Sequence, residues 1–137
     1  DPETQPLMMR LQSDLAEVML AVTDGTLDQV SLKWDPRPAM CVVATSKGYP
    51  GEYPAGVPIE GIKQADGMHD VKVFHSGTAM QGQQLVTAGG RVLGVTALGN
   101  SYADAQKRAY EAMRLSHVDG MHYRHDIGWQ ATETTGT

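Results

Sequence analysis

Apolar residues recur at three- and four-residue steps between positions 6 and 24, the spacing of one face of an α-helix. Polar residues such as Arg10 and Asp14 fall between them. Pro6 suits the first turn of a helix, where its missing N–H leaves no bond unmade. Gly25 can adopt the left-handed conformation that commonly ends a helix. We therefore predict one amphipathic helix over residues 6–24, with an apolar face of Leu7, Leu11, Leu15, Val18 and Val22.

The segment that follows, residues 27–38, is rich in turn formers, and we expect Trp34-Asp35-Pro36-Arg37-Pro38 to join two structural units. Residues 39–46 form a short apolar run with β-branched side chains, which is typical of a buried strand. A long loop over residues 47–58 then holds three of the seven prolines. Loops of this length inside a compact domain are often functional.

Three more strands are predicted beyond this loop. Gly82 and the Gly89-Gly90 pair stand where tight turns would join adjacent strands, because glycine accepts positive φ. Short neighbouring strands with such turns indicate an antiparallel meander. The predicted strands are residues 71–75 (continuing toward Met80), 84–87 and 91–98.

A second helix is expected to start at Ser101, because Ser101-Tyr102-Ala103-Asp104 resembles a capping box, and to run to about His117. The polar tail over residues 130–137 is expected to be disordered. These elements together predict an α+β fold, in which helices pack on a small antiparallel β-sheet.

Composition excludes several classes of protein. A chain of 137 residues corresponds to one domain, or to a small domain with a fragment of another. It has no apolar run of about 18 residues, so we expect a soluble chain without a membrane partner. The net charge of −5 and the scattered basic residues argue against nucleic acid. A lone Cys41 fits a reducing compartment, and the start at Asp1 has no signal peptide and suggests a longer parent protein.

Two segments are candidates for binding a metal or an anion. Asp1 and Glu3 precede the first predicted helix, where two carboxylates suit either Mg²⁺ or a favourable interaction with the helix dipole. In Gly89-Gly90-Arg91, the glycines let backbone amides approach a ligand, and the guanidinium fork suits phosphate or carboxylate. The alternative for this second segment is a hairpin turn followed by a solvated Arg91.

Two histidine-containing segments are weaker candidates. His75, before Ser76-Gly77-Thr78, is either an acid–base group or a hydrogen-bonded structural residue. Residues 117–126 contain three His and two Asp, but the spacing matches no common zinc pattern. The residue pattern favours the structural interpretation in both segments.

Taken in order, short blocks from Asp1 to about Trp129 resemble one family, the phosphoribosylamine–glycine ligases, which are ATP-grasp enzymes. No block is specific alone, and the resemblance depends on their order and spacing. The blocks are Asp1-Pro2-Glu3-Thr4-Gln5-Pro6, Ser13-Asp14-Leu15, Trp34-Asp35-Pro36-Arg37, Gly48-Tyr49-Pro50-Gly51, Val73-Phe74-His75-Ser76-Gly77-Thr78, Val86-Thr87, Gly89-Gly90-Arg91-Val92-Leu93, Val95-Thr96-Ala97-Leu98-Gly99 and Arg124-His125-Asp126-Ile127-Gly128.

The resemblance implies a cytoplasmic carbon–nitrogen ligase of purine biosynthesis. Such an enzyme uses ATP and Mg²⁺ (or Mn²⁺) to activate the glycine carboxylate as an acyl phosphate. The amine of 5-phosphoribosylamine then displaces phosphate to give glycinamide ribonucleotide. It also implies that residues 1–34 are the end of an ATP-grasp domain, that residues 35–129 are the C-terminal domain, and that this domain packs on the ATP-grasp domain.

The resemblance also assigns roles to individual residues. Arg91 is expected to hold the substrate phosphate, and four further residues are expected beside the same pocket. Asp1 and Glu3 are expected near a metal site whose Glu and Asn ligands lie upstream of Asp1. The four residues beside Arg91 are Gly90, His75, Gly77 and Thr78.

Other functions remain open at this point. A fragment of the ligase is expected to be inactive alone. One alternative is a stand-alone module that binds phosphate or carboxylate through Gly89-Gly90-Arg91 without catalysis. Another is a non-catalytic domain of a fused purine-pathway polypeptide.

Overall fold

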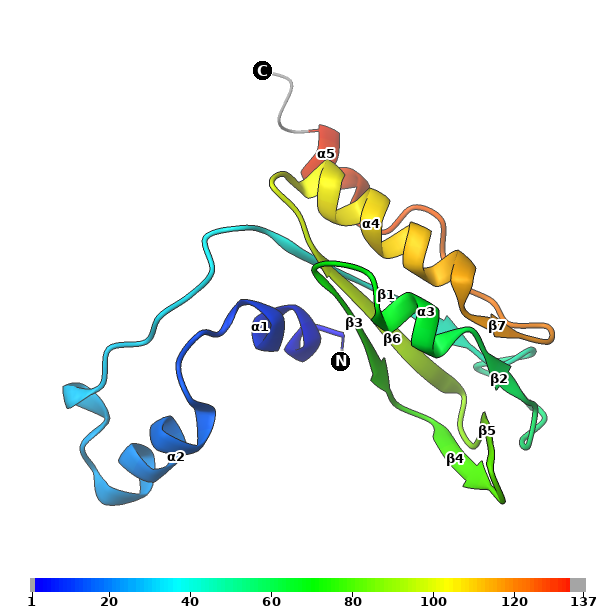
Figure 1. The fold of residues 1–137 in the computed structure, drawn as a ribbon, viewed down its shortest axis with the longest axis horizontal. Helices are drawn as coiled ribbons and strands as arrows, with labels where there is room; N and C mark the ends of the chain where they lie inside the picture. The colour runs from blue at the N-terminus through cyan, green and yellow to red at the C-terminus, as the bar shows by residue number, and fades with distance from the viewer. Residues whose placement is uncertain (1, 134–137) are drawn as a thin grey trace.

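The computed structural model describes residues 2–133. Its centre is a three-stranded antiparallel sheet with the order β1-β6-β3, made by β1 (Ala39–Thr45), β6 (Arg91–Leu98) and β3 (Val71–His75) (Figure 1). β6 pairs with both neighbours along its length, and every residue of β6 after Arg91 is buried. A nearly continuous apolar strand suits this central place, because both of its faces are covered.

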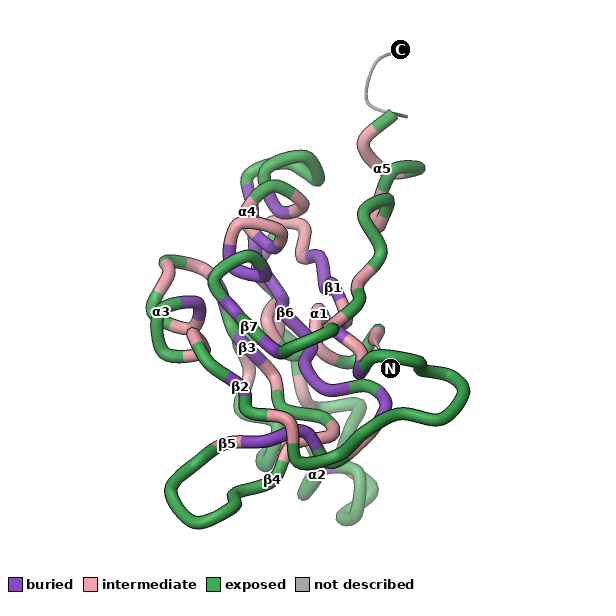
Figure 2. Tube along the Cα trace, turned by 90° about the vertical axis from the view of Figure 1, so that its right-hand side faces the viewer, coloured by how far each residue is buried: buried purple, intermediate pink, exposed green. Residues whose placement is uncertain are grey.

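Helices cover the two faces of this sheet. On one face lie α4 (Tyr102–Leu115) and the short α3 (Ile62–Asp66). Ala105, Ala109 and Ala112 of α4 are fully buried, and their small side chains let the helix pack closely on the strands. On the other face lies α1 (Thr4–Arg10), where a Cβ added to Gly94 of β6 would meet the side chain of Gln5. Figure 2 shows the buried residues gathered along β1, β6 and α4.

The smaller elements lie around this sheet. β4 (Thr78–Gln81) and β5 (Gln84–Thr87) form a separate hairpin, with Gly82 at positive φ in its turn as predicted. β2 (Ile59–Glu60) pairs with β7 (His117–Val118), and α5 (Trp129–Glu133) ends the described chain. The α+β fold class is confirmed.

The prediction of one helix over residues 6–24 is wrong, because the chain forms α1 and then a second helix, α2 (Leu15–Asp24). Leu11 is extended and bridges to Trp34, and the Gln12 N–H donates to the Lys33 carbonyl at 2.9 Å. The Asp14 carboxylate accepts the Ala16 N–H at 2.8 Å and so starts α2. A short polar side chain favours such a cap over a helix interior, which explains the break. The predicted end at Gly25, with φ of 70°, is confirmed.

The predicted meander is also wrong, although the strands at 84–87 and 91–98 are confirmed. β3 pairs with β6 and not with β4, and β5 does not pair with β6. The strand is interrupted at Gly77, between β3 and β4. The Gly77 N–H donates to the Arg91 carbonyl, and its carbonyl accepts the Ala88 N–H, both at 2.8 Å. Gly77 and Gly89 therefore pack backbone against backbone, so the Gly89-Gly90 pair does not form a tight hairpin turn.

Two end points differ from the sequence predictions. The Ser101 hydroxyl accepts the Asp104 N–H at 3.1 Å, which confirms the cap, but α4 ends at Leu115 because His117 pairs with Glu60 in β7. Residues 130–133 lie in α5, so the prediction of disorder is wrong for them; residues 134–137 lie outside the described part. No helix within residues 2–133 has the length and apolar character needed to cross a membrane.

An ionic network joins the segment before β1 to the sheet. The Arg37 guanidinium donates to both carboxylate oxygens of Asp35, at 3.0 Å from Nε and 2.7 Å from Nη2, and its Nη1 donates to Asp70 at 2.7 Å. Asp70 also accepts from Arg108 of α4 at 3.1 Å. The Asp35 and Asp70 side chains are only 13% and 15% exposed, so these bonds are partly shielded from water. The network ties residues 35–37, the start of β3 and α4 to one another.

This network predicts acid-sensitive stability. The Arg37 side chain and then the Arg37 backbone N–H donate to Asp35 and lower its pKa to about 2. A lowered pKa means that the ionised carboxylate is favoured by folding, so its contribution is present above about pH 4 and is lost as pH falls through about 2. We expect Asp35→Asn to lower the free energy of unfolding near neutral pH and to flatten its decline between these values. Urea unfolding at stepped pH measures both effects.

A matched surface variant provides the control for this experiment. Asp28→Asn removes an exposed carboxylate that has no part in the network, and it should reproduce the acid decline of the wild type. Equal slopes for the Asp35→Asn and Asp28→Asn variants would contradict the role of the Arg37 bonds.

Candidate functional site

Arg91 is the first residue of β6 and its side chain is exposed, while the strand beyond it is buried. Its strand partner is Thr45, after an irregularity in the register between Ala44 and Thr45. Ser46, which is buried, holds the preceding glycines: its N–H donates to the Gly90 carbonyl and its hydroxyl donates to the Gly89 carbonyl, both at 2.8 Å. The backbone that carries Arg91 is therefore held from the end of β1.

Gly90 is buried beneath two aromatic rings. A Cβ added at this position would collide with the Tyr49 ring and would lie 3.1 Å from Cε1 of Tyr53. The two rings are tilted, with their centroids 6.3 Å apart. Glycine is thus required by close approach of side chains and not by backbone conformation.

A pocket of about 230 Å³ lies beside Arg91. Pro2 lines it from the N-terminal side, and Cys41 and Val43 line it from β1. The segment after β7 forms another wall and is fixed to Thr45, whose N–H donates to the His122 carbonyl at 2.8 Å and whose carbonyl accepts the His122 N–H at 3.0 Å. The remaining lining residues are Thr45, Tyr49, Arg91, His122, Tyr123, Arg124 and Ile127.

The lining of this pocket combines two guanidinium groups with an apolar floor. Arg124 donates to both carboxylate oxygens of Asp126, at 2.9 and 2.7 Å, and this hydrogen bonding lowers the pKa of Asp126. Burial raises the pKa of the Cys41 thiol, which therefore stays neutral. Guanidinium nitrogens beside largely apolar walls suit a ligand that joins an anionic group to a less polar body, although the charge of Arg124 is offset by Asp126.

His75 lies in a different place from Arg91. It pairs with Leu93 at the end of β3 and lines a second pocket of about 620 Å³, between α3 and the β4–β5 hairpin. Its Nδ1 is 3.1 Å from the Thr78 hydroxyl. His75 and Arg91 therefore line different pockets: His75 pairs with Leu93, which faces the buried core, whereas the register shift between Ala44 and Thr45 pairs Arg91 with Thr45 of the other pocket. A role of His75 in substrate binding stays a prediction. Gly77 is packed on Gly89 and lines neither pocket.

The metal candidates give no complete ligand set in the described part of the chain. Within residues 2–133, no three His, Cys, Asp or Glu side chains gather so as to hold a metal ion. Glu3 stands at the start of α1, and a hydrogen bond with its own backbone N–H lowers its pKa. Asp1 lies outside the described residues. In the histidine-rich segment, the His125 ring contacts Tyr123 with centroids 4.8 Å apart.

Comparison with known proteins assigns the family. A model of the phosphoribosylglycinamide synthetase C domain matches residues 39–130, which contain the whole sheet and α4. The chain belongs to this family.

Relatives and a solved structure agree with the family match. The chain is 52% identical over 131 residues to a phosphoribosylamine–glycine ligase of Vibrio vulnificus, covering 96% of this chain and 30% of that protein. It is 50% identical over 134 residues to the ligase of Escherichia coli O157:H7, covering 97% and 31%. The crystal structure of the Thermotoga maritima ligase matches with a TM-score of 0.63 at 28% identity, covering 81% of this chain and 27% of that one. The chain thus spans about a third of the length of these relatives.

Several residues at the pocket of this C domain escaped the sequence prediction. Ser46, Tyr49, His122 and Arg124 come from loops, and loop contacts cannot be deduced from periodicity. The Gly48-Tyr49-Pro50-Gly51 block and the unusual length of the loop at 47–58 were the available signals. Nothing in the sequence pairs Thr45 with His122, because they are 77 positions apart.

The packing at Gly90 predicts the outcome of a double-mutant cycle. Gly90→Ala should lower the free energy of unfolding by about 1–3 kcal/mol, because an added methyl overpacks the site. The same change in a Tyr49→Ala background should be less harmful, because the colliding ring has been removed. Urea unfolding of the four proteins gives the coupling energy, and a value near zero would show that the Tyr49 ring does not rest on Gly90.

Proposed function

We propose that this chain is the C-terminal part of a phosphoribosylamine–glycine ligase. The complete enzyme would join glycine to 5-phosphoribosylamine with hydrolysis of ATP to ADP and phosphate, giving glycinamide ribonucleotide in purine biosynthesis in the cytoplasm. The observation that carries this proposal is 50–53% identity to ligases of this name across nearly the whole chain. The pocket at Arg91 supports it, because it brings together Pro2 from the first matching sequence block and Arg124 and Ile127 from the last.

Arg91 is proposed to bind the phosphate of 5-phosphoribosylamine. A guanidinium offers a planar pair of donors that matches two phosphate oxygens, and it keeps its charge at any physiological pH. The buried strand β6 and the Ser46 bonds fix the backbone on which Arg91 stands, so little freedom is lost when the phosphate binds. Gly90 contributes by admitting the tyrosine rings, while the roles of His75, Gly77 and Thr78 in substrate binding stay predictions.

The remaining groups of the reaction would come largely from outside residues 2–133. The described residues do not by themselves fit a Mg²⁺ or Mn²⁺ site. When bound, such an ion would neutralise phosphate charge during transfer to the glycine carboxylate. We place its ligands, and the ATP site, in the part that relatives have and this chain lacks. Glu3 and Asp1 would then lie at the edge of that site.

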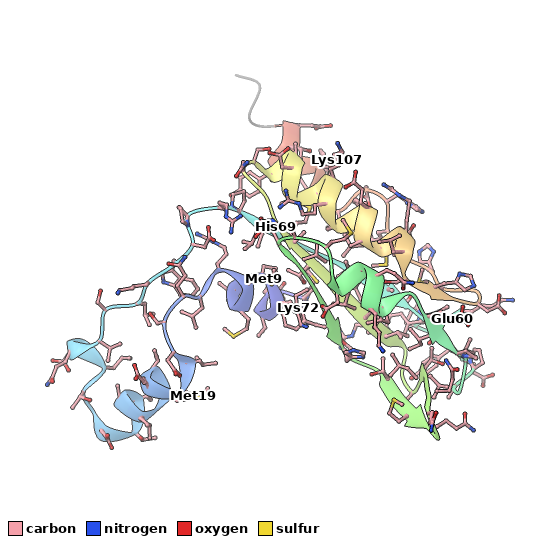
Figure 3. All side chains as sticks on the ribbon, viewed as in Figure 1. Met9, Met19, Glu60, His69, Lys72 and Lys107 are labelled. Carbon is pink, nitrogen blue, oxygen red and sulfur yellow. The ribbon has the colours of Figure 1, made fainter. Side chains whose placement is uncertain are left out.

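Residues 7–34, the N-terminal arm, are proposed to pack on the part of the ligase that the relatives have and this chain lacks. α2 contacts little else than η1 (Leu27–Gln29), and Ala21 is its only buried residue. Figure 3 shows Met19 on this arm, apart from the sheet. We propose that the exposed apolar side chains of residues 7–34 form this interface, because their exposure to water is unfavourable. They are Leu7, Met8, Leu15, Met19, Leu20, Val22, Leu27, Leu32 and Trp34.

Substitution of Arg91 in the complete ligase tests the phosphate role. We expect Arg91→Ala to raise the KM for 5-phosphoribosylamine by about 10- to 100-fold, because a charge-assisted pair of hydrogen bonds is lost. Arg91→Lys should recover only part of this, because an ammonium cannot form the planar fork. The KM for ATP serves as the internal control and should change little. An unchanged KM for 5-phosphoribosylamine would exclude the role.

The isolated 137-residue chain should lack ligase activity. We expect no release of ADP that depends on glycine and 5-phosphoribosylamine, because the ATP and metal groups are absent from it. Release of ADP by the complete ligase under the same conditions is the control. Substrate-dependent ADP release by the isolated chain would contradict the proposed division of the active site.

A further inference from the structure

The loop over residues 47–58 is held at both ends by the segment that leads into Arg91. Ser46 bonds to Gly89 and Gly90 at its start, as described above. At its end, the Gly56 N–H donates to the Thr87 carbonyl at 2.7 Å, and the Thr87 N–H donates to the Val57 carbonyl at 2.8 Å. The loop therefore forms a closed strap whose two ends rest on residues 87–90.

The two tyrosines of this strap differ in what they face. Both rings cover Gly90, but only Tyr49 also lines the pocket that contains Arg91. Within residues 2–133 no side chain or backbone group is bonded to the Tyr49 hydroxyl, and the residue is 39% exposed. Tyr49 thus presents a ring and a free hydroxyl beside the guanidinium, while the neighbouring Tyr53 does not.

We propose that Tyr49 is the residue by which this pocket selects a ribose 5-phosphate ligand over other phosphate monoesters. The inference rests on the proposed function, since it takes Arg91 as the phosphate contact. The pocket of about 230 Å³ is of the right order for a small phosphorylated sugar. The aromatic face would pack against the C–H face of the ribose, and the hydroxyl would bond to a ring hydroxyl.

The separate roles of Arg91 in phosphate binding and of Tyr49 in sugar selection have a physical basis. A guanidinium attracts any phosphate monoester, so Arg91 alone discriminates poorly between sugars and simple alkyl phosphates. Selectivity requires a group that contacts the part of the ligand that differs. The Tyr49 ring is held against Gly90 by the strap, so it meets the sugar already in position.

Competitive inhibition of the complete ligase against 5-phosphoribosylamine provides the test. The two probes are ribose 5-phosphate and glycerol 3-phosphate, which carry the same phosphate monoester and differ in the sugar ring. We expect Tyr49→Ala to raise the inhibition constant of ribose 5-phosphate about tenfold and that of glycerol 3-phosphate less than about threefold. Tyr49→Phe, which keeps the ring and should fold, is expected to lie between Tyr49→Ala and wild type. Tyr53→Ala is the matched control, and it should leave the inhibition constants of both probes close to their wild-type values.

The outcomes separate this inference from the proposed function. Equal changes for both probes, or none, in Tyr49→Ala and Tyr49→Phe would overturn the selectivity role. If Arg91→Ala also weakens both probes alike, the phosphate site stands and only the role of Tyr49 is lost. If ribose 5-phosphate does not compete in the wild type, or if Arg91→Ala leaves both constants unchanged, the proposed phosphate site fails first. A loss of selectivity in Tyr53→Ala equal to that in Tyr49→Ala would indicate that the strap as a whole, and not Tyr49, is responsible.

Discussion

The burial of β6 between two strands and between helices on both faces is the constraint on which the other features depend. Its backbone groups are bonded to β1 and β3, and its side chains fill the core on one face and meet α1 on the other. Arg91, the first residue of β6, is its one exposed residue, because burial of its charge would be unfavourable. The point at which the core ends therefore sets the position of the guanidinium beside the pocket.

The pocket is assembled around this end of β6 by backbone contacts more than by side-chain charges. Ser46 holds the glycine pair, Thr45 holds the segment at His122, and Gly77 packs on Gly89. The Ser46 bonds satisfy a buried polar side chain, and the contact between Gly77 and Gly89 needs the absence of a Cβ. The result is a firmly held backbone from which the positively charged side chain of Arg91 can meet an anion without reorganisation of the main chain.

Local features were predictable because neighbouring residues determine them. The left-handed Gly25, the Ser101 cap and the strands at 84–87 and 91–98 each follow from short-range sterics and hydrogen bonding. The single helix over 6–24 failed because its apolar spacing continued across a break that Asp14 and the bridge to Trp34 impose. The meander failed because strand pairing depends on which edges of β6 must be covered, and adjacency in the chain does not decide that.

The sequence by itself determined the family blocks, the strands and Arg91 as a candidate for phosphate, because residue type and local pattern carry that information. Only the tertiary structure decided that His75 and Arg91 belong to different pockets, since His75 pairs with core-facing Leu93 while a register shift pairs Arg91 with Thr45. It also decided that Tyr49 lies on Gly90 beside Arg91. These relations join residues that are distant in the sequence, and they are set by the packing of whole strands and loops, which no local pattern specifies.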